Sequence, residues 1–146
     1  MEKFDFLKLF NEDPCTQTII DSLNLSVNKE KIFLDNLNGS LKPIIAATII
    51  QKTNFNILFI LENLEDALYF LDDVNNLNIN TPSFLLPSSK RIKAGDNNVV
   101  LERIGALKNI LSQKKTSIVT YPEAIQEKII RKTDFKKSRL TIELGK

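Results

Sequence analysis

Two short apolar segments constrain the fold of this chain more than any other feature: NILFIL at residues 56–61 and TSIVTYP at residues 116–122. Continuous apolar runs of about four to eight residues are typical of strands that are buried on both faces of a sheet. Residues 63–77 and 97–113 carry apolar residues at helical spacing, and PSFLLP at 82–87 predicts a short strand. Alternating strands and helices imply right-handed crossovers. The sequence therefore predicts an α/β fold with a mostly parallel sheet and helices on both faces.

The flanking segments continue this alternation. Asp13 is a natural N-cap and Pro14 suits the first helical position, so a helix is predicted over residues 13–24. Pro43 opens a further helix, predicted to end near Thr53. The remaining predicted elements are a short helix at 4–10, a first strand at 31–37, a helix at 122–130 and a final strand at 138–144.

The length of 146 residues predicts one domain with a substantial core. We expect this domain at 31–135, after an N-terminal helical segment at 1–30 and before a linker strand or the start of another domain at 136–146. The sequence has no apolar run long enough for a membrane span and no secretory signal, and Cys15 is its single cysteine. We therefore expect a cytoplasmic protein without membrane, disulfide or metal partners.

Histidine is absent from the chain. This removes the commonest general base, the serine–histidine and cysteine–histidine nucleophiles, and most zinc sites. Catalysis would need carboxylates, lysine or a bound cofactor. We expect no catalytic residue in this chain.

Charge is unevenly spread along the chain. Residues 1–80 hold 6 lysines and 12 acidic residues, whereas residues 81–146 hold 14 basic and 6 acidic residues, so the two parts carry about −6 and +8. A basic half can contact phosphate backbones or an acidic partner, although charge runs are most often solvated faces. The candidate nucleic-acid contacts are Lys90, Arg91, Lys93, Lys136, Lys137 and Arg139. The chain lacks the clustered aromatic residues on which single strands stack.

The segment between the predicted strand at 31–37 and the following helix is similar to a phosphate-binding loop, G-x-x-x-x-G-K-[ST]. In this register Lys42 keeps the lysine position, but Asn36 and Leu41 replace the two glycines and Pro43 replaces the hydroxyl residue. Leu41 brings a Cβ atom where the backbone must approach phosphate. Pro43 offers neither a hydroxyl group for magnesium nor an N–H group for phosphate.

Gly39, Ser40 and Lys42 are therefore the candidates for nucleotide contacts, and we expect no specific nucleotide binding. A helix N-terminus attracts anions by itself, so weak phosphate binding is predicted but ATP hydrolysis is not. Glu62, at the end of the apolar run 56–61, occupies the place of the acid that orients magnesium in ATPases. The alternative, which we favour, is that Glu62 and Asn63 begin the next helix.

In their order, five segments resemble the N-terminal domain of the bacterial transcription-repair coupling factor, which is itself similar to the first domain of the UvrB component of the Uvr excision nuclease. The segments are NGSLKPIIAATII, NILFILENLEDALYFLDDV, FLLPSSKR, NNVVLERIGALKNIL and SIVTYPEAIQEKI, within residues 31–145. In the family this domain has the shape of a P-loop NTPase-like helicase lobe, and the coupling factor has a degenerate nucleotide loop, with which Leu41 and Pro43 agree. The family often has an acidic and aromatic stretch where this chain has Ser88–Arg91, so contacts made there are not carried over.

The resemblance implies a non-catalytic domain whose parent protein uses ATP and magnesium in a separate DNA translocase motor. The parent recognises RNA polymerase stalled at a DNA lesion and recruits the UvrA component of the Uvr excision nuclease, mainly through the following domain. Two alternatives remain at this point. One is a P-loop domain with residual ATP binding in a helicase-like repair enzyme, and the other is a direct nucleic-acid binder that uses the basic half.

Overall fold

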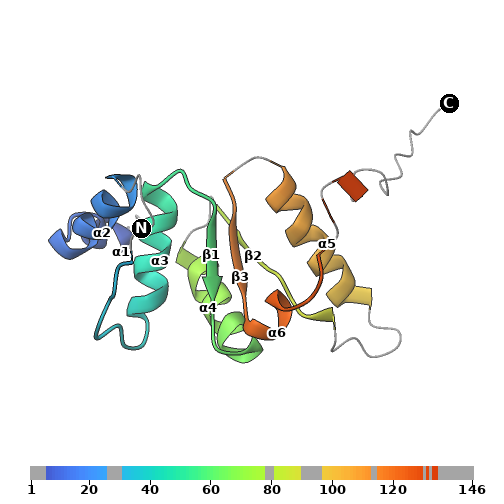
Figure 1. The fold of residues 1–146 in the computed structure, drawn as a ribbon. Coiled ribbons are helices and arrows are strands. Elements are labelled where there is room, and N and C mark those ends of the chain that lie inside the picture. Colours follow the sequence, from blue (N-terminus) through green and yellow to red (C-terminus); the bar gives the residue numbers. More distant parts are fainter. Residues whose placement is uncertain are drawn as a thin grey trace, which may run out of the picture.

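The computed structural model describes residues 6–25, 31–77, 81–89, 97–112, 115–129, 131 and 133–134. In chain order the elements are α1 (Phe6–Asn11), α2 (Pro14–Leu25), α3 (Leu41–Lys52), β1 (Ile57–Ile60), α4 (Leu64–Leu77), β2 (Ser83–Leu85), α5 (Asn97–Leu111), β3 (Ser117–Thr120) and α6 (Pro122–Ile125). Figure 1 shows α1, α2 and α3 gathered on one side of the sheet and α5 on the other. None of the helices in the described ranges is long and apolar enough to cross a membrane.

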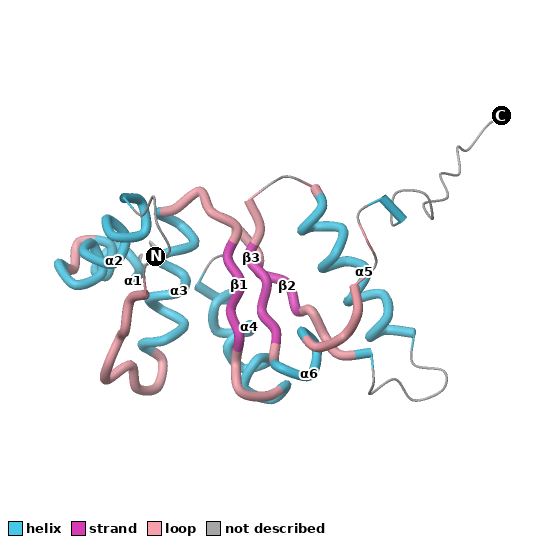
Figure 2. The backbone as a smooth tube through the Cα atoms, viewed as in Figure 1, coloured by secondary structure: helices cyan, strands magenta, loops and turns pink. Residues whose placement is uncertain are grey.

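Three strands form a small open sheet in the order β1-β3-β2, and both pairings are parallel. Figure 2 shows the strands side by side with β3 in the middle. In the register, Leu58 lies beside Ile118 and Phe84 also lies beside Ile118. All four residues of β3 are buried, because β3 has a strand on each side and helices over its faces. The predicted parallel sheet is thus confirmed, with strands at 57–60, 83–85 and 117–120.

α4 covers one face of the sheet. Ala67 of α4 packs with Val119 of β3 in one buried cluster, and Val74 packs with Ala46 and Ile50 of α3 in another. Two half-buried rings join strand to helix: the centroids of Phe59 and Phe70 lie 5.1 Å apart with their planes tilted by 57°. Amphipathic spacing along α4 thus places small residues against the strands and leaves its charged residues outside.

α5 covers the opposite face. Ala106 of α5 packs with Ile118 and Leu86, and Phe84 and Leu107 close this cluster. Ile118 and Val119 are successive residues of a strand, so their side chains point to opposite faces of the sheet. The prediction of helices on both faces is therefore confirmed.

The N-terminal helices pack on α3 rather than on the sheet. Leu7 of α1 contacts Ile44 and Ala47 of α3 in a buried cluster. Asp13 caps α2 as expected, because its Oδ2 atom accepts hydrogen bonds from the Thr16 N–H at 2.8 Å and from the Thr16 hydroxyl at 3.0 Å.

The prediction of a strand at 31–37 is wrong. These residues form no strand, and Phe33 is 84% exposed. An apolar run becomes a strand only where a neighbouring chain offers hydrogen bonds, and no described strand lies alongside this run. The helix predicted at 122–130 is shorter than expected, because α6 ends at Ile125. The predicted strand at 138–144 lies outside the described residues.

Candidate functional site at the start of α3

The turn that leads into α3 is built from local backbone hydrogen bonds. Asn38 N–H donates to Asn36 O at 3.0 Å, and Leu41 N–H donates to Asn38 O at 3.3 Å. Asn36 and Gly39 both have positive φ angles, 62° and 55°, which Asn tolerates and which Gly adopts without strain. The glycine of this turn therefore serves the turn itself, and its backbone does not have to approach a ligand.

The first turn of α3 offers few N–H groups to an anion. The Leu41 N–H is already bonded within the turn, Pro43 has no N–H, and the Ile44 N–H donates to Ser40 O at 3.2 Å. The Ser40 side chain makes no capping hydrogen bond. Within the first turn of α3, the Lys42 N–H is thus the one donor left, and the N–H groups of Gly39 and Ser40 precede it in the loop.

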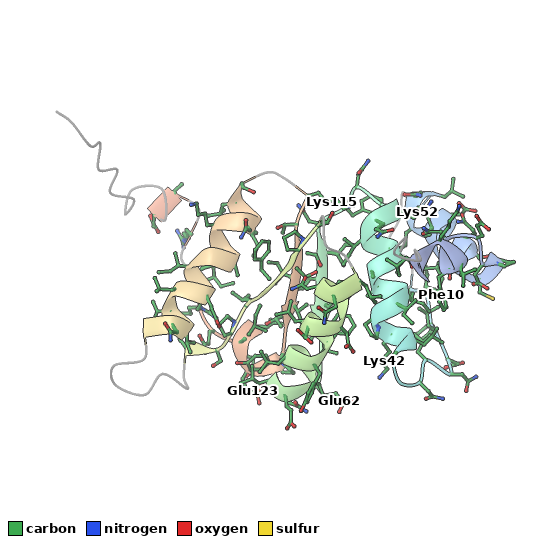
Figure 3. The ribbon with its side chains drawn as sticks, turned by 180° about the vertical axis from the view of Figure 1, so that it is seen from behind. Phe10, Lys42, Lys52, Glu62, Lys115 and Glu123 are labelled. Carbon is green, nitrogen blue, oxygen red and sulfur yellow. The ribbon has the colours of Figure 1, made fainter. Side chains whose placement is uncertain are left out.

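The structure brings Gly39, Lys42 and Glu62 to one small cavity of about 240 Å³. Figure 3 shows Lys42 and Glu62 at the same end of the molecule. The cavity is lined by residues from three places: Gly39, Lys42 and Pro43 at the start of α3, Leu61 and Glu62 after β1, and Asp66, Tyr69, Phe70 and Asp73 on α4. This position, beyond the carboxyl end of a parallel strand, is where α/β proteins commonly bind ligands.

The charges around this cavity oppose phosphate. Its lining carries the carboxylates of Glu62, Asp66 and Asp73 and the single ammonium group of Lys42, a net charge of −2. A nucleoside triphosphate would bring several negative charges into the same space. Within the described ranges, no group of three or more histidine, cysteine, aspartate or glutamate side chains could hold a metal ion.

The hydrogen bonds of Asn63 show why an acidic residue, Glu62, stands shortly after β1. The Asn63 Oδ1 atom accepts a hydrogen bond from the Asp66 N–H at 2.9 Å, and its amide group donates to the Asp66 carboxylate at 2.8 Å. Asn63 is therefore the N-cap of α4, and Glu62 is an exposed residue just before it. This arrangement agrees with the interpretation that these residues begin a helix.

The basic candidates cannot be placed. Lys90, Arg91, Lys93, Lys136, Lys137 and Arg139 all lie outside the described residues.

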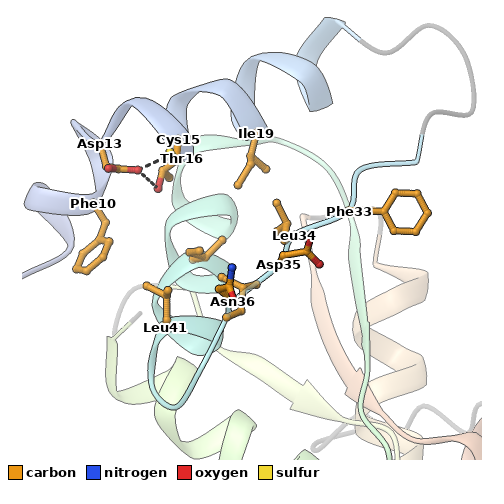
Figure 4. A pocket seen from close by; sticks show the side chains of 12 residues that line it. Phe10, Asp13, Cys15, Thr16, Ile19, Phe33, Leu34, Asp35, Asn36 and Leu41 are labelled. Carbon is orange, nitrogen blue, oxygen red and sulfur yellow. Dashed lines mark hydrogen bonds between the residues drawn. The ribbon is translucent and has the colours of Figure 1, made fainter.

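A second, larger cavity lies among α2, residues 33–37 and α3 (Figure 4). Its volume is about 470 Å³, and apolar side chains such as Phe10, Ile19 and Leu41 form most of its wall. Asp13, at its rim, is already bonded to Thr16 as the helix cap. Asp13 and Thr16 at this cavity thus serve the local fold.

A polar cluster that the sequence did not indicate joins three segments that are distant in the chain. We call it the Glu127 clamp; it consists of Glu127, Ser88, Ser89 and Arg103. The Glu127 carboxylate accepts hydrogen bonds from the hydroxyl groups of both serines and, at 3.0 Å, from the Ser89 N–H. It also lies 3.4 Å from the Arg103 guanidinium, and the side chains of this pair are only 12% and 8% exposed.

The clamp holds its acid in the charged form. Burial by itself raises the pKa of the Glu127 carboxyl, but the hydrogen bonds from Ser88 and Ser89 and the charge of Arg103 outweigh it and lower the pKa to about 2. Arg103 also donates to Pro87 O, and the Ser88 N–H donates to the Tyr121 hydroxyl at 2.9 Å. Hydrogen bonds thus link the segment after β2 to Arg103 of α5 and to Glu127, which follows α6. Partners 38 and 39 residues apart leave no local pattern by which the sequence could have revealed them.

Comparisons with models of protein families, with curated proteins and with solved structures found no match for this chain.

Proposed function

We propose that this chain is a non-catalytic interaction domain, the N-terminal domain of a transcription-repair coupling factor. In this proposal its fold is that of a P-loop NTPase-like helicase lobe whose nucleotide loop no longer works. The parent protein would be an ATP-dependent DNA translocase that links RNA polymerase stalled at a lesion to the UvrA component of the excision nuclease, in the cytoplasm.

One observation carries the non-catalytic part of this proposal: the cavity at the start of α3 has a net charge of −2, and in the first turn of α3 the N–H groups of Leu41 and Ile44 are already bonded. A working loop needs several N–H donors and a positive field at this place. The position after a parallel strand and at the N-terminus of a helix is that of a nucleotide site, but the chemical groups are not. The link to a coupling factor is supported by the order of the five sequence segments described above.

Melting of the chain with ATP and magnesium tests the loss of nucleotide binding. A ligand that binds only the native state raises the melting temperature, and at a hundredfold excess over its dissociation constant it adds about 2.7 kcal/mol of stability. We expect no shift with millimolar ATP and magnesium. A magnesium-dependent rise in melting temperature that is lost in Lys42→Ala would overturn the proposal and favour a domain with residual ATP binding.

Recruitment is tested separately. The UvrA component of the excision nuclease is mixed with this chain and with a longer piece of the parent that includes the following domain. We expect capture by the longer piece and little by this chain alone. Absence of binding to both would contradict the proposed parent, and it would leave the result on ATP unaffected.

A further inference from the structure

β1 forms one edge of the sheet, and among the described residues its outer side has no strand partner. The N–H groups of Ile57 and Leu61 donate inward to the backbone beside β3, at 3.0 and 2.9 Å. Because backbone groups alternate in direction along a strand, the N–H and C=O groups of Leu58 and Ile60 point away from β3. β1 therefore presents a row of donors and acceptors with which another strand can pair.

The residues of β1 themselves provide none of the usual protection of an edge strand. Native proteins shield edge strands with charged residues, prolines or bulges, whereas β1 consists of four apolar residues, Ile-Leu-Phe-Ile. The side chains of Leu58 and Ile60 lie on the face opposite α4, and these residues are 54% and 58% exposed. Apolar surface thus lies uncovered beside the unpaired edge of β1.

A hollow beside β1 has room for more side chains. It has a volume of about 470 Å³ and is mostly apolar, with Leu23 of α2, Ile49 of α3 and Phe55 in its wall next to β1. Figure 1 shows α3 next to β1 on the side away from β3. Ala46 and Ile50 of α3 pack in one cluster with Ile57 and Phe59 of β1. α3 would therefore also cover one face of a strand added at this edge.

We propose that this edge binds an extended segment of a partner protein as a fourth, parallel strand, whose apolar side chains fill the hollow. Lys52 is the last residue of α3 and residues 53–56 lie between it and β1, whereas Glu62 follows β1; the two charges lie at opposite ends of the molecule (Figure 3). A parallel segment with an acidic residue at its start and a basic residue at its end would meet an opposite charge at each end. This binding site rests on the geometry of β1 and is independent of the function proposed above.

A second copy of the chain fits this edge less well than a lone strand. In an antiparallel pairing of two β1 strands, each copy would bring its own α3 to the same face of the combined sheet. The α3 helix of one copy already covers that face beside its own β1, so the α3 helix of the second copy would overlap with it.

The test uses a synthetic peptide, acetylated and amidated, of sequence Glu-Val-Thr-Val-Thr-Val-Lys, and the 15N-labelled chain. We expect saturating peptide to slow the exchange of the Leu58 and Ile60 amide hydrogens at least about tenfold, as new backbone hydrogen bonds form. Two further peptides carry N-methyl groups on the valines or on the threonines. Only one of these two sets faces β1, so only one of them should abolish binding.

Three variants locate the site. Ile60→Lys should abolish binding, and Ile110→Lys, at an exposed position of α5, should leave it unchanged; both residues are exposed, so both variants should fold. Lys52→Glu should weaken binding by roughly two- to fivefold, as expected for one exposed ion pair. Unchanged exchange at Leu58 and Ile60, or equal loss of binding with both N-methylated peptides, would overturn the proposal. Faster exchange at Leu58 in Phe33→Asp without peptide would also overturn it, because residues 31–37 would then be the natural occupant of the edge.

Discussion

Replacing Glu127 by Gln removes the charge at the centre of the Glu127 clamp and keeps the size of the side chain. The pKa of the carboxyl falls from 4.5 to about 2 in the folded chain, and at about 1.4 kcal/mol per pKa unit this corresponds to roughly 3 kcal/mol. Ser89 is exposed, so water screens part of this interaction. We therefore expect Glu127→Gln to lower the free energy of unfolding by about 1–2 kcal/mol near neutral pH.

The effect should depend on pH in a defined direction. Because the pKa of Glu127 is lower in the folded than in the unfolded chain, its carboxylate stabilises the fold above about pH 4.5, and this contribution is lost as the pH falls towards 2. Urea unfolding followed by circular dichroism at about pH 7 and about pH 3 measures the difference between the two proteins. The difference should shrink at the lower pH.

Glu102→Gln is the matched control, because Glu102 is an exposed acid on α5 next to Arg103 in the sequence. It should change the free energy of unfolding by no more than about 0.5 kcal/mol at either pH. If Glu127→Gln loses no more stability than Glu102→Gln, or if its loss is the same at both pH values, the carboxylate does not hold the clamp together.

Three further substitutions test the local structure by urea unfolding. Gly39→Ala should lower the free energy of unfolding by about 1–2 kcal/mol, because Gly39 has a φ angle of 55°. The added β-carbon would meet no neighbour, so the loss is backbone strain alone. Unchanged stability would contradict the positive φ angle of this turn. Ser83→Ala should lower the free energy of unfolding by about 1–2 kcal/mol, because the buried Ser117 hydroxyl loses its hydrogen-bond partner at 2.9 Å. Adding Ser117→Ala to this variant should cost little more. Fully additive losses would show that the two hydroxyl groups do not interact. Asn63→Ala should cost about 1 kcal/mol as the loss of an N-cap, whereas the exposed Glu62→Ala should cost less, and the reverse order would assign the cap to Glu62.

The sequence predicted the elements whose evidence is local. The apolar runs at 56–61 and 116–122 became β1 and β3, and the periodic segments became α4 and α5, because a strand or helix that buries apolar residues shows its period in the sequence. The same holds for Asp13, whose cap bonds to Thr16 span three residues. The strand order β1-β3-β2 was not predicted, because it depends on which strands meet after the crossovers have formed.

The candidate site was predicted in part. The sequence indicated that Leu41 and Pro43 spoil a phosphate-binding loop, and the bonded N–H groups of the first turn of α3 agree with that interpretation. It did not indicate that Asp66 and Asp73 of α4 would face Lys42 across a cavity. Lys42 is on α3 and the two aspartates are on α4, and β1 separates these helices in the chain, so no local pattern places them at one cavity. A glycine restored at position 41 would therefore leave the repulsion of phosphate in place.

The strand wrongly predicted at 31–37 and the open edge of β1 have the same physical origin. Both segments are short and apolar, with Phe33 and Ile60 among the more exposed apolar residues, yet of the two only β1 has a strand neighbour in the part of the chain that the structure describes. Apolar content thus predicts where a strand can form, whereas the pairing of N–H and C=O groups decides whether it does. β1 has only one of its two sides paired within the described residues. The same rule that excludes a strand at 31–37 therefore predicts that β1 gains stability from a strand on its outer side.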